Sequence, residues 1–151
     1  MTIKLEITQS QASPYVWIAE IGRAKLGIHE ADGWCVQLND KISFIDSEDR
    51  CDPLLPVLEL DKHLFFEHLQ NIASSNDTLS KAIGGFPKEL LLKHAFHSSF
   101  SAYWPEKALA WLAEDVALQP AFKSELATFA DNAVMPQQTR QKAKKILKSL
   151  Q

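Results

Sequence analysis

The spacing of apolar residues changes partway along this 151-residue chain, from every second residue to every third or fourth. Before Asp46, the sequence consists of short β-prone runs, which cover residues 15–21, 26–30, 34–38 and 42–45. Asp32-Gly33 and Asn39-Asp40 separate the last three runs, and such dipeptides favour tight hairpin turns. We therefore expect a small antiparallel β-meander over residues 15–46, followed by an acidic loop that Pro53 and Pro56 keep out of the sheet.

From Asp61 onward the sequence has a helical period. Asp61 can cap a helix in which Phe65, Leu69 and Ile72 recur every three or four residues. Gly84-Gly85 is a strong signal for the end of a second, shorter helix. The helical part is therefore expected to cover residues 61–150.

Three prolines divide the last fifty residues into segments of similar length. Pro105, Pro120 and Pro136 each open a segment with a narrow apolar stripe. The stripes are Leu109, Leu112 and Val116, then Phe122, Leu126 and Phe129, then Ala143, Ile146, Leu147 and Leu150. A narrow stripe cannot be buried alone, so these helices must stack on each other. The sequence predicts an α+β fold in a single domain, residues 1–151, with a β-meander followed by a bundle of about five stacked α-helices.

Charge is distributed unevenly along the chain. Residues 1–80 contain 13 acids and 6 bases, whereas residues 81–151 contain 6 acids and 10 bases. Between residues 30 and 61 there are nine acids, and Lys41 and Arg50 are the two bases. This region is either a solvated loop or a surface that meets a basic partner. The candidate partner-binding residues are Asp40, Asp46, Glu48, Asp49, Asp52 and Asp61.

Other readings of the acidic stretch fit less well. A calcium loop of the EF-hand type needs a central glycine and a terminal glutamate, and residues 46–57 have neither in the required place. Glycoside hydrolysis needs two carboxylates in different environments, which neighbouring exposed acids do not provide.

The remaining reactive residues form no recognisable catalytic or metal-binding set. His94 and His97 could share one helix face, but a third zinc ligand is not evident nearby. Cys35 sits in an apolar run, and the acids around Cys51 would raise its thiol pKa. We expect no metal, no cofactor and no enzymatic activity.

Nucleic acid and membranes are not expected as partners. The basic segment Arg140–Lys148 lacks aromatic residues on which bases could stack. No apolar run approaches the roughly 18 residues that span a membrane. The N-terminus lacks the apolar core of a signal peptide, so we expect a cytoplasmic protein with reduced cysteines.

The acidic stretch 46–52, the hairpin DGWCVQL and the closing helices YWPEKALAWLAEDV and PQQTRQKAKKIL give the chain the general character of a known class. It resembles the bacterial immunity proteins that are paired with contact-dependent growth-inhibition toxins. The resemblance implies a protein that binds its cognate toxin domain and blocks it. Many such toxins are nucleases, whose clefts must be positive to hold phosphates.

Residues 126–147 also resemble a HEAT-like helical hairpin, with Arg140 and Ala143 in its second helix. The alternative function is therefore a HEAT-like helical adaptor or scaffold, whose binding should depend little on salt. A third possibility is a small hydrolase that uses His94 or His97. An immunity protein should bind one basic partner in a salt-dependent way, and the sequence leaves its oligomeric state open.

Overall fold

The computed structural model describes residues 3–9, 13–98 and 101–151. In the described residues the strands precede the helices, which confirms the predicted α+β fold class. The chain divides into two compact units, residues 1–88 and residues 89–151. The expectation of a single domain over residues 1–151 stays a prediction, which cooperative unfolding would test.

The first unit begins with a five-stranded antiparallel sheet in which every strand pairs with its neighbours in sequence. The strands are β1 (Ile3–Thr8), β2 (Tyr15–Ile21), β3 (Ala24–His29), β4 (Gly33–Leu38) and β5 (Lys41–Phe44). The predicted meander over residues 15–46 accounts for four of these strands. It is wrong at its start, because it omits β1.

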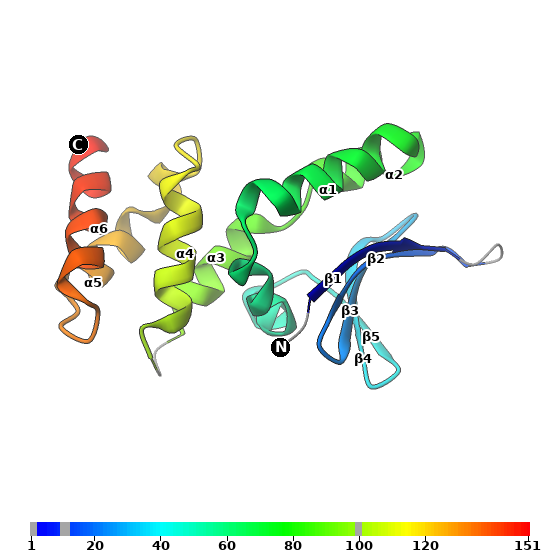
Figure 1. Cartoon of the computed structure of the whole chain (residues 1–151), viewed down its shortest axis with the longest axis horizontal. Helices are drawn as coiled ribbons and strands as arrows, with labels where there is room; N and C mark the ends of the chain where they lie inside the picture. Colours follow the sequence, from blue (N-terminus) through cyan, green and yellow to red (C-terminus); the bar gives the residue numbers. More distant parts are fainter. Residues whose placement is uncertain (1–2, 10–12, 99–100) are drawn as a thin grey trace. The chain divides into compact units, whose positions relative to one another are not determined.

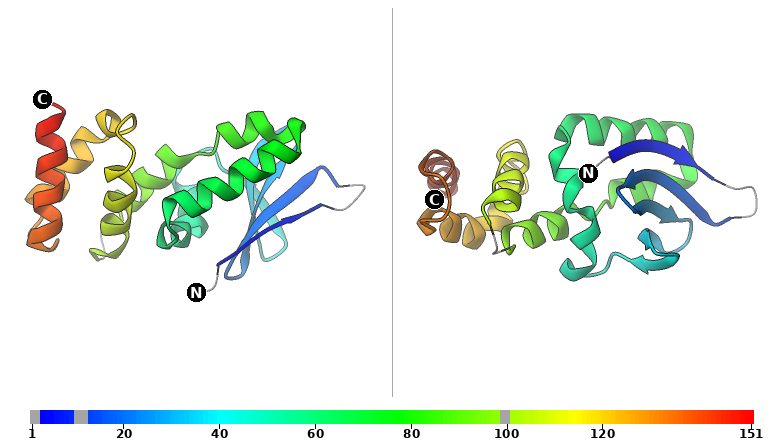
Figure 2. Two further views of the ribbon diagram at one scale, coloured as in Figure 1. Left: turned by 45° about the horizontal axis from the view of Figure 1, so that its top comes forward. Right: turned by 60° about the horizontal axis from the view of Figure 1, so that its bottom comes forward.

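One face of the sheet carries the core of the first unit. Val16, Ile18, Leu26 and Ile28 are each at most 1% exposed. Helices α1 (Lys62–Ser75) and α2 (Asp77–Gly84) run over the sheet (Figures 1 and 2). The indole N–H of Trp34 donates to the backbone carbonyl of Ala82 at 2.6 Å, which ties β4 to α2.

The opposite face of the sheet carries a row of aromatic rings. Tyr15 stacks on Trp17 with the ring centroids 5.5 Å apart, and its edge contacts His29, which in turn meets Phe44. Gly27 lies beneath this row, where a Cβ atom would come within 2.4 Å of the Trp17 ring. The absence of a side chain at Gly27 therefore lets the indole lie flat against β3.

Local hydrogen bonds set the helix boundaries of the first unit. The Asp61 side chain accepts hydrogen bonds from the backbone N–H groups of His63 and Leu64, so it caps α1 as predicted. Asn76 ends α1 and caps α2 through the N–H of Thr78. The predicted stripe of Phe65, Leu69 and Ile72 is buried, at 0%, 1% and 3% exposure.

The second unit consists of short stacked helices. They are α3 (Lys88–Phe96), α4 (Tyr103–Ala113), the 3-10 helix η2 (Gln119–Phe122), α5 (Lys123–Asp131) and α6 (Gln137–Ser149). Leu112, Phe122 and Leu126 are 0% exposed and form the centre of its core. This confirms that residues 105–150 contain helices rather than strands.

Three predicted core positions in this unit are wrong or only partly right. Val116 is 73% exposed, because α4 ends at Ala113 and leaves Val116 in the following turn. Ile146 and Leu147 are only half-buried, whereas Ala143 is fully buried. Ala143 therefore lies on the face of α6 that packs against its neighbours.

Candidate functional site

The acidic stretch leads into a 3-10 helix, η1 (Glu48–Glu59), rather than the loop predicted from Pro53 and Pro56. A 3-10 helix has three residues per turn, so side chains three positions apart lie one above another. Cys51, Leu54 and Val57 form one such row, and each is 0% exposed. This buried row anchors η1 against the first unit, where its neighbours include β2.

The same period of three aligns two of the candidate carboxylates. Asp49 and Asp52 occupy one row of η1, and both are exposed. Asp46 is also exposed and lies two residues before the helix begins. Asp46, Asp49 and Asp52 are called the acidic surface below.

A shallow hollow of about 490 Å³ lies between η1 and the β4–β5 hairpin. The hairpin side is lined by Val36, Leu38, Lys41 and Ser43. Val36 pairs with Ser43 and Leu38 with Lys41, so these four side chains share one face of the hairpin. Asp49, Arg50, Asp52 and Pro53 line the η1 side. The hollow thus joins two members of the acidic surface to the last strand of the sheet.

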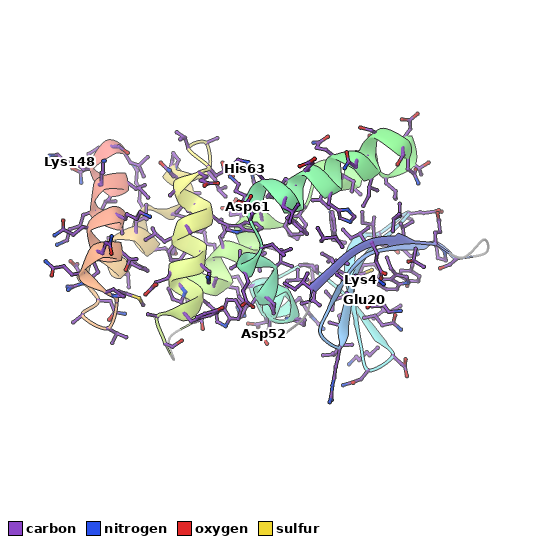
Figure 3. All side chains as sticks on the ribbon, in the orientation of Figure 1. Lys4, Glu20, Asp52, Asp61, His63 and Lys148 are labelled. Atoms are coloured by element: carbon purple, nitrogen blue, oxygen red, sulfur yellow. The ribbon has the colours of Figure 1, made fainter. Side chains whose placement is uncertain are left out.

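The structure separates the other three candidate carboxylates from this group. Asp61 caps α1, where it serves the fold (Figure 3). Glu48 is half-buried and stands in the same row as Cys51, so it faces inward more than Asp49 does. Asp40 lies in the β4–β5 turn and shares a different hollow with Arg23 and Lys25. The six candidates therefore do not form one continuous surface.

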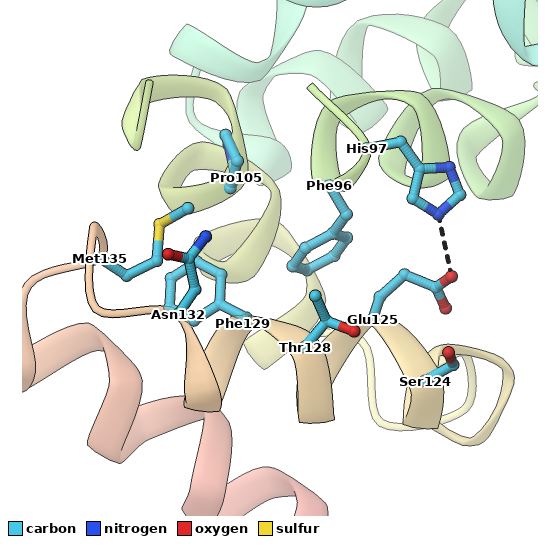
Figure 4. Close-up of a pocket in the computed structure, with 9 residues that line it drawn as sticks. All are labelled: Phe96, His97, Pro105, Ser124, Glu125, Thr128, Phe129, Asn132 and Met135. Atoms are coloured by element: carbon cyan, nitrogen blue, oxygen red, sulfur yellow. Dashed lines mark hydrogen bonds and ion pairs between the residues drawn. The ribbon is translucent and has the colours of Figure 1, made fainter. Parts of the chain in front are cut away.

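A second candidate site lies in the second unit, around His97. A pocket of about 110 Å³ is lined by residues from α3, α4 and α5, among them Phe96, His97, Pro105 and Glu125 (Figure 4). The Nε2 atom of His97 lies 3.0 Å from Oε2 of Glu125. Lys93 donates to Oε1 of the same carboxylate at 3.3 Å and to the Ala121 carbonyl at 2.9 Å.

Opposing effects act on the pKa of Glu125. Burial of the carboxyl raises its pKa, but hydrogen bonds from His97, from its own backbone N–H and from Lys93 together lower it below the ordinary value. Glu125 is therefore a carboxylate at neutral pH, and it links α3 to α5. Pockets that hold drug-sized ligands measure about 300–1,000 Å³, so this smaller pocket fits a structural role better than substrate binding.

Both cysteines are buried and unpaired with each other. Burial raises the pKa of the Cys35 thiol to about 11. Burial, and then the charge of Glu48, raise the pKa of Cys51 to about 12. This confirms the predictions that Cys35 is a small core residue and that nearby acid raises the Cys51 pKa, which leaves both thiols protonated.

His68 has a structural task that the sequence did not reveal. Its Nε2 lies 3.1 Å from the Glu6 carbonyl oxygen and 2.9 Å from that of Ile18. Since both partners are acceptors, Nε2 must carry the proton. In the part of the chain that the structure describes, no three His, Cys, Asp or Glu side chains gather as a metal site would require. The absence of a bound metal stays a prediction.

The period of three in η1 is the signal that sequence reasoning missed. Cys51, Leu54 and Val57 are spaced by three, and so are Asp46, Asp49 and Asp52. Pro53 and Pro56 are predicted only to end the strand region, and both lie within η1. Among the described residues, no helix is both long enough and apolar enough to cross a membrane.

Comparison with known proteins gave no match: no family model, curated protein or solved structure is similar to this chain.

Proposed function

We propose that this chain is an immunity protein, which binds the basic domain of one cognate protein toxin and blocks its activity. The observation that carries the proposal is the exposure of Asp49 and Asp52, one above the other on the first two turns of η1, with Asp46 just before it. Buried side chains hold that row in place, so the carboxylates are presented by a fixed element rather than by a loose loop.

The proposed partner is a nuclease domain. A nuclease must keep a positive cleft to bind the phosphates of its substrate. Carboxylates held at a fixed spacing can occupy such a cleft in place of phosphates, and the opposite charges accelerate association. Binding there would exclude the nucleic acid, which is how a non-catalytic protein neutralises the toxin. We propose a cytoplasmic site of action, where such a nuclease would meet its substrate.

The test neutralises the acidic surface. In the variant Asp46→Asn, Asp49→Asn and Asp52→Asn, every side chain keeps its size and loses its charge. Each pairwise energy is small, about 1 kcal/mol at contact in water, so the effect must be collective. The partner domain is to be sought in the reading frame directly upstream of this gene. We expect the association rate with that purified toxin domain to fall about tenfold or more at low salt. Its salt dependence should flatten.

A matched control removes the same number of charges elsewhere. Glu67, Glu89 and Asp131 are exposed and lie outside the acidic stretch. Changing them to Gln, Gln and Asn alters the net charge equally, and we expect the association rate to change much less. If both triple variants associate at similar rates, overall charge rather than the acidic surface steers binding. If the wild-type protein does not bind the domain, the proposed function is wrong.

A further inference from the structure

The sheet has two edge strands, β1 and β5, and their pairing differs in regularity. Edge strands present unpaired backbone N–H and C=O groups, and proteins often blunt them with bulges. The pairing of β1 with β2 shifts between Leu5 and Thr8, and that of β2 with β3 shifts between Trp17 and Ala19. The His68 ring satisfies carbonyl groups at these irregularities. The β1 edge is therefore irregular.

The β5 edge is regular. Four consecutive pairs join β4 to β5 without a shift, from Cys35 with Phe44 to Leu38 with Lys41. Asn39 and Asp40 have φ angles of 53° and 63°, the left-handed conformation that a two-residue type I′ turn requires at both central positions. This turn fixes the register of the hairpin and the direction of every backbone group in β5.

The alternation along β5 shows which backbone groups point outward. The two residues that flank a two-residue turn hydrogen-bond to each other through their backbones, so the N–H and C=O groups of Lys41 point toward β4. The N–H of Ile45 donates to the Trp34 carbonyl at 3.1 Å, so the backbone groups of Ile45 also point toward β4. Ile42 and Phe44 lie in the opposite phase, so their N–H and C=O groups point away from β4, along the edge of the sheet.

Carboxylates outnumber cations around this edge, where Asp46, Asp49 and Asp52 lie near Lys41 and Arg50. The hollow lined by Asp49 and Asp52 borders the face of β5 that carries Lys41 and Ser43. Asp46 follows β5 after a single residue. A strand added at this edge would direct alternate side chains over the hollow, where positive groups would meet Asp49 and Asp52.

We propose that an extended, basic segment of the protein partner pairs with β5 as a sixth strand, with bonds to Ile42 and Phe44 and cationic side chains against the acidic surface. This inference rests on the proposed function and adds its binding mode. Backbone pairing supplies affinity in such strand addition, and the alternate side chains supply specificity. Charge favours a basic partner over a second copy of this chain, whose first eighty residues carry 13 acids and 6 bases.

The first test is the variant Ile42→Pro, measured with the purified domain encoded directly upstream. Proline removes the outward N–H, and its ring blocks a neighbouring strand. The bonds of β5 to β4 come from Lys41, Ser43 and Ile45, so the sheet should survive. We expect affinity to fall at least about tenfold, which corresponds to roughly 1.4 kcal/mol. The control Ile42→Val keeps the N–H and the β-branched shape, and should bind like the wild type.

Hydrogen exchange provides a second test that needs no substitution. In the free protein the amide protons of Ile42 and Phe44 should exchange readily, and in the saturated complex they should be protected. This measurement decides the question even if Ile42→Pro does not fold. Amides that still exchange at the free rate in the saturated complex would overturn the inference.

The outcomes separate this inference from the proposed function. If neutralising the acidic surface slows association but Ile42→Pro binds normally, the immunity role stands and strand addition is wrong. Protection that increases with protein concentration, without the toxin domain, would assign the edge to a second copy of this chain instead. If the wild-type protein does not bind the domain, both proposals are wrong.

Discussion

Replacement of Gly27 by alanine should destabilise the first unit. A Cβ atom at this position would lie 2.4 Å and 2.8 Å from two ring carbons of Trp17 and 2.8 Å from the Val16 carbonyl oxygen. Favourable contacts between carbon atoms occur at about 3.5–4.0 Å, so the indole would have to move by about 1 Å or more. The carbonyl belongs to the paired backbone of β2 and cannot move without disturbing the sheet.

The expected size of the effect follows from two contributions. Overpacking costs about 1–3 kcal/mol. Moving Trp17 also disturbs its stack on Tyr15, and an aromatic pair contributes about 0.5–1.5 kcal/mol. We expect a loss of about 2–4 kcal/mol in the free energy of unfolding, measured by urea denaturation followed by circular dichroism.

Gly84 offers the matched control. It lies at the end of α2, and a Cβ atom there would meet nothing within 4 Å. Gly84→Ala should therefore leave stability unchanged or raise it by up to about 1 kcal/mol. In a Trp17→Ala background, the cost of Gly27→Ala should shrink, because the ring contact is gone. A Gly27→Ala protein within about 0.5 kcal/mol of the wild type would refute the packing of Trp17 against β3.

Three further predictions concern the interior. Because burial raises the pKa of Cys35 to about 11 and that of Cys51, also raised by Glu48, to about 12, neither thiol should react with a disulfide reagent near pH 8 until urea unfolds the chain. The pKa of Glu125 is lower in the folded protein than in the unfolded chain. The carboxylate therefore stabilises the fold above the unfolded pKa, and this contribution is lost as pH falls through the folded pKa. Glu125→Gln should make the free energy of unfolding depend less on pH in the acid range. Leu126→Ala should lower the free energy of unfolding by about 2–5 kcal/mol. If Gly27→Ala and Leu126→Ala lower the midpoint of the same single unfolding transition, the chain unfolds as one domain. Two separate transitions would contradict that expectation.

The regular elements could be predicted from the sequence because local signals decided them. Asp61 and Asn76 cap helices through their own side chains, and Asn39-Asp40 forms its turn through its own backbone conformation. These interactions span a few residues, so a single sequence contains the whole cause. The strand β1 was missed although Ile3, Leu5 and Ile7 alternate with polar residues, since an edge strand is decided by its pairing with β2.

The candidate site could be predicted only in part. Charge alone selected six carboxylates, because composition shows where acids gather along the chain. It does not show which way they point. Asp49 and Asp52 are exposed on the first two turns of η1, and Glu48 lies on the buried row. The β4–β5 turn places Asp40 in a hollow that Arg23 also lines. Tertiary packing of the row through Cys51 decides this orientation.

The structural role of Asp61 can be separated by experiment from the binding role proposed for the acidic surface. Asp61 accepts hydrogen bonds from two backbone N–H groups, so Asp61→Ala should cost about 1 kcal/mol whether or not a partner is present. Asp49 is an exposed carboxylate of η1, and exposed charges contribute little to stability. Asp49→Asn should therefore change stability little while it slows binding. Asp61→Ala should do the reverse, lowering stability while changing the association rate much less.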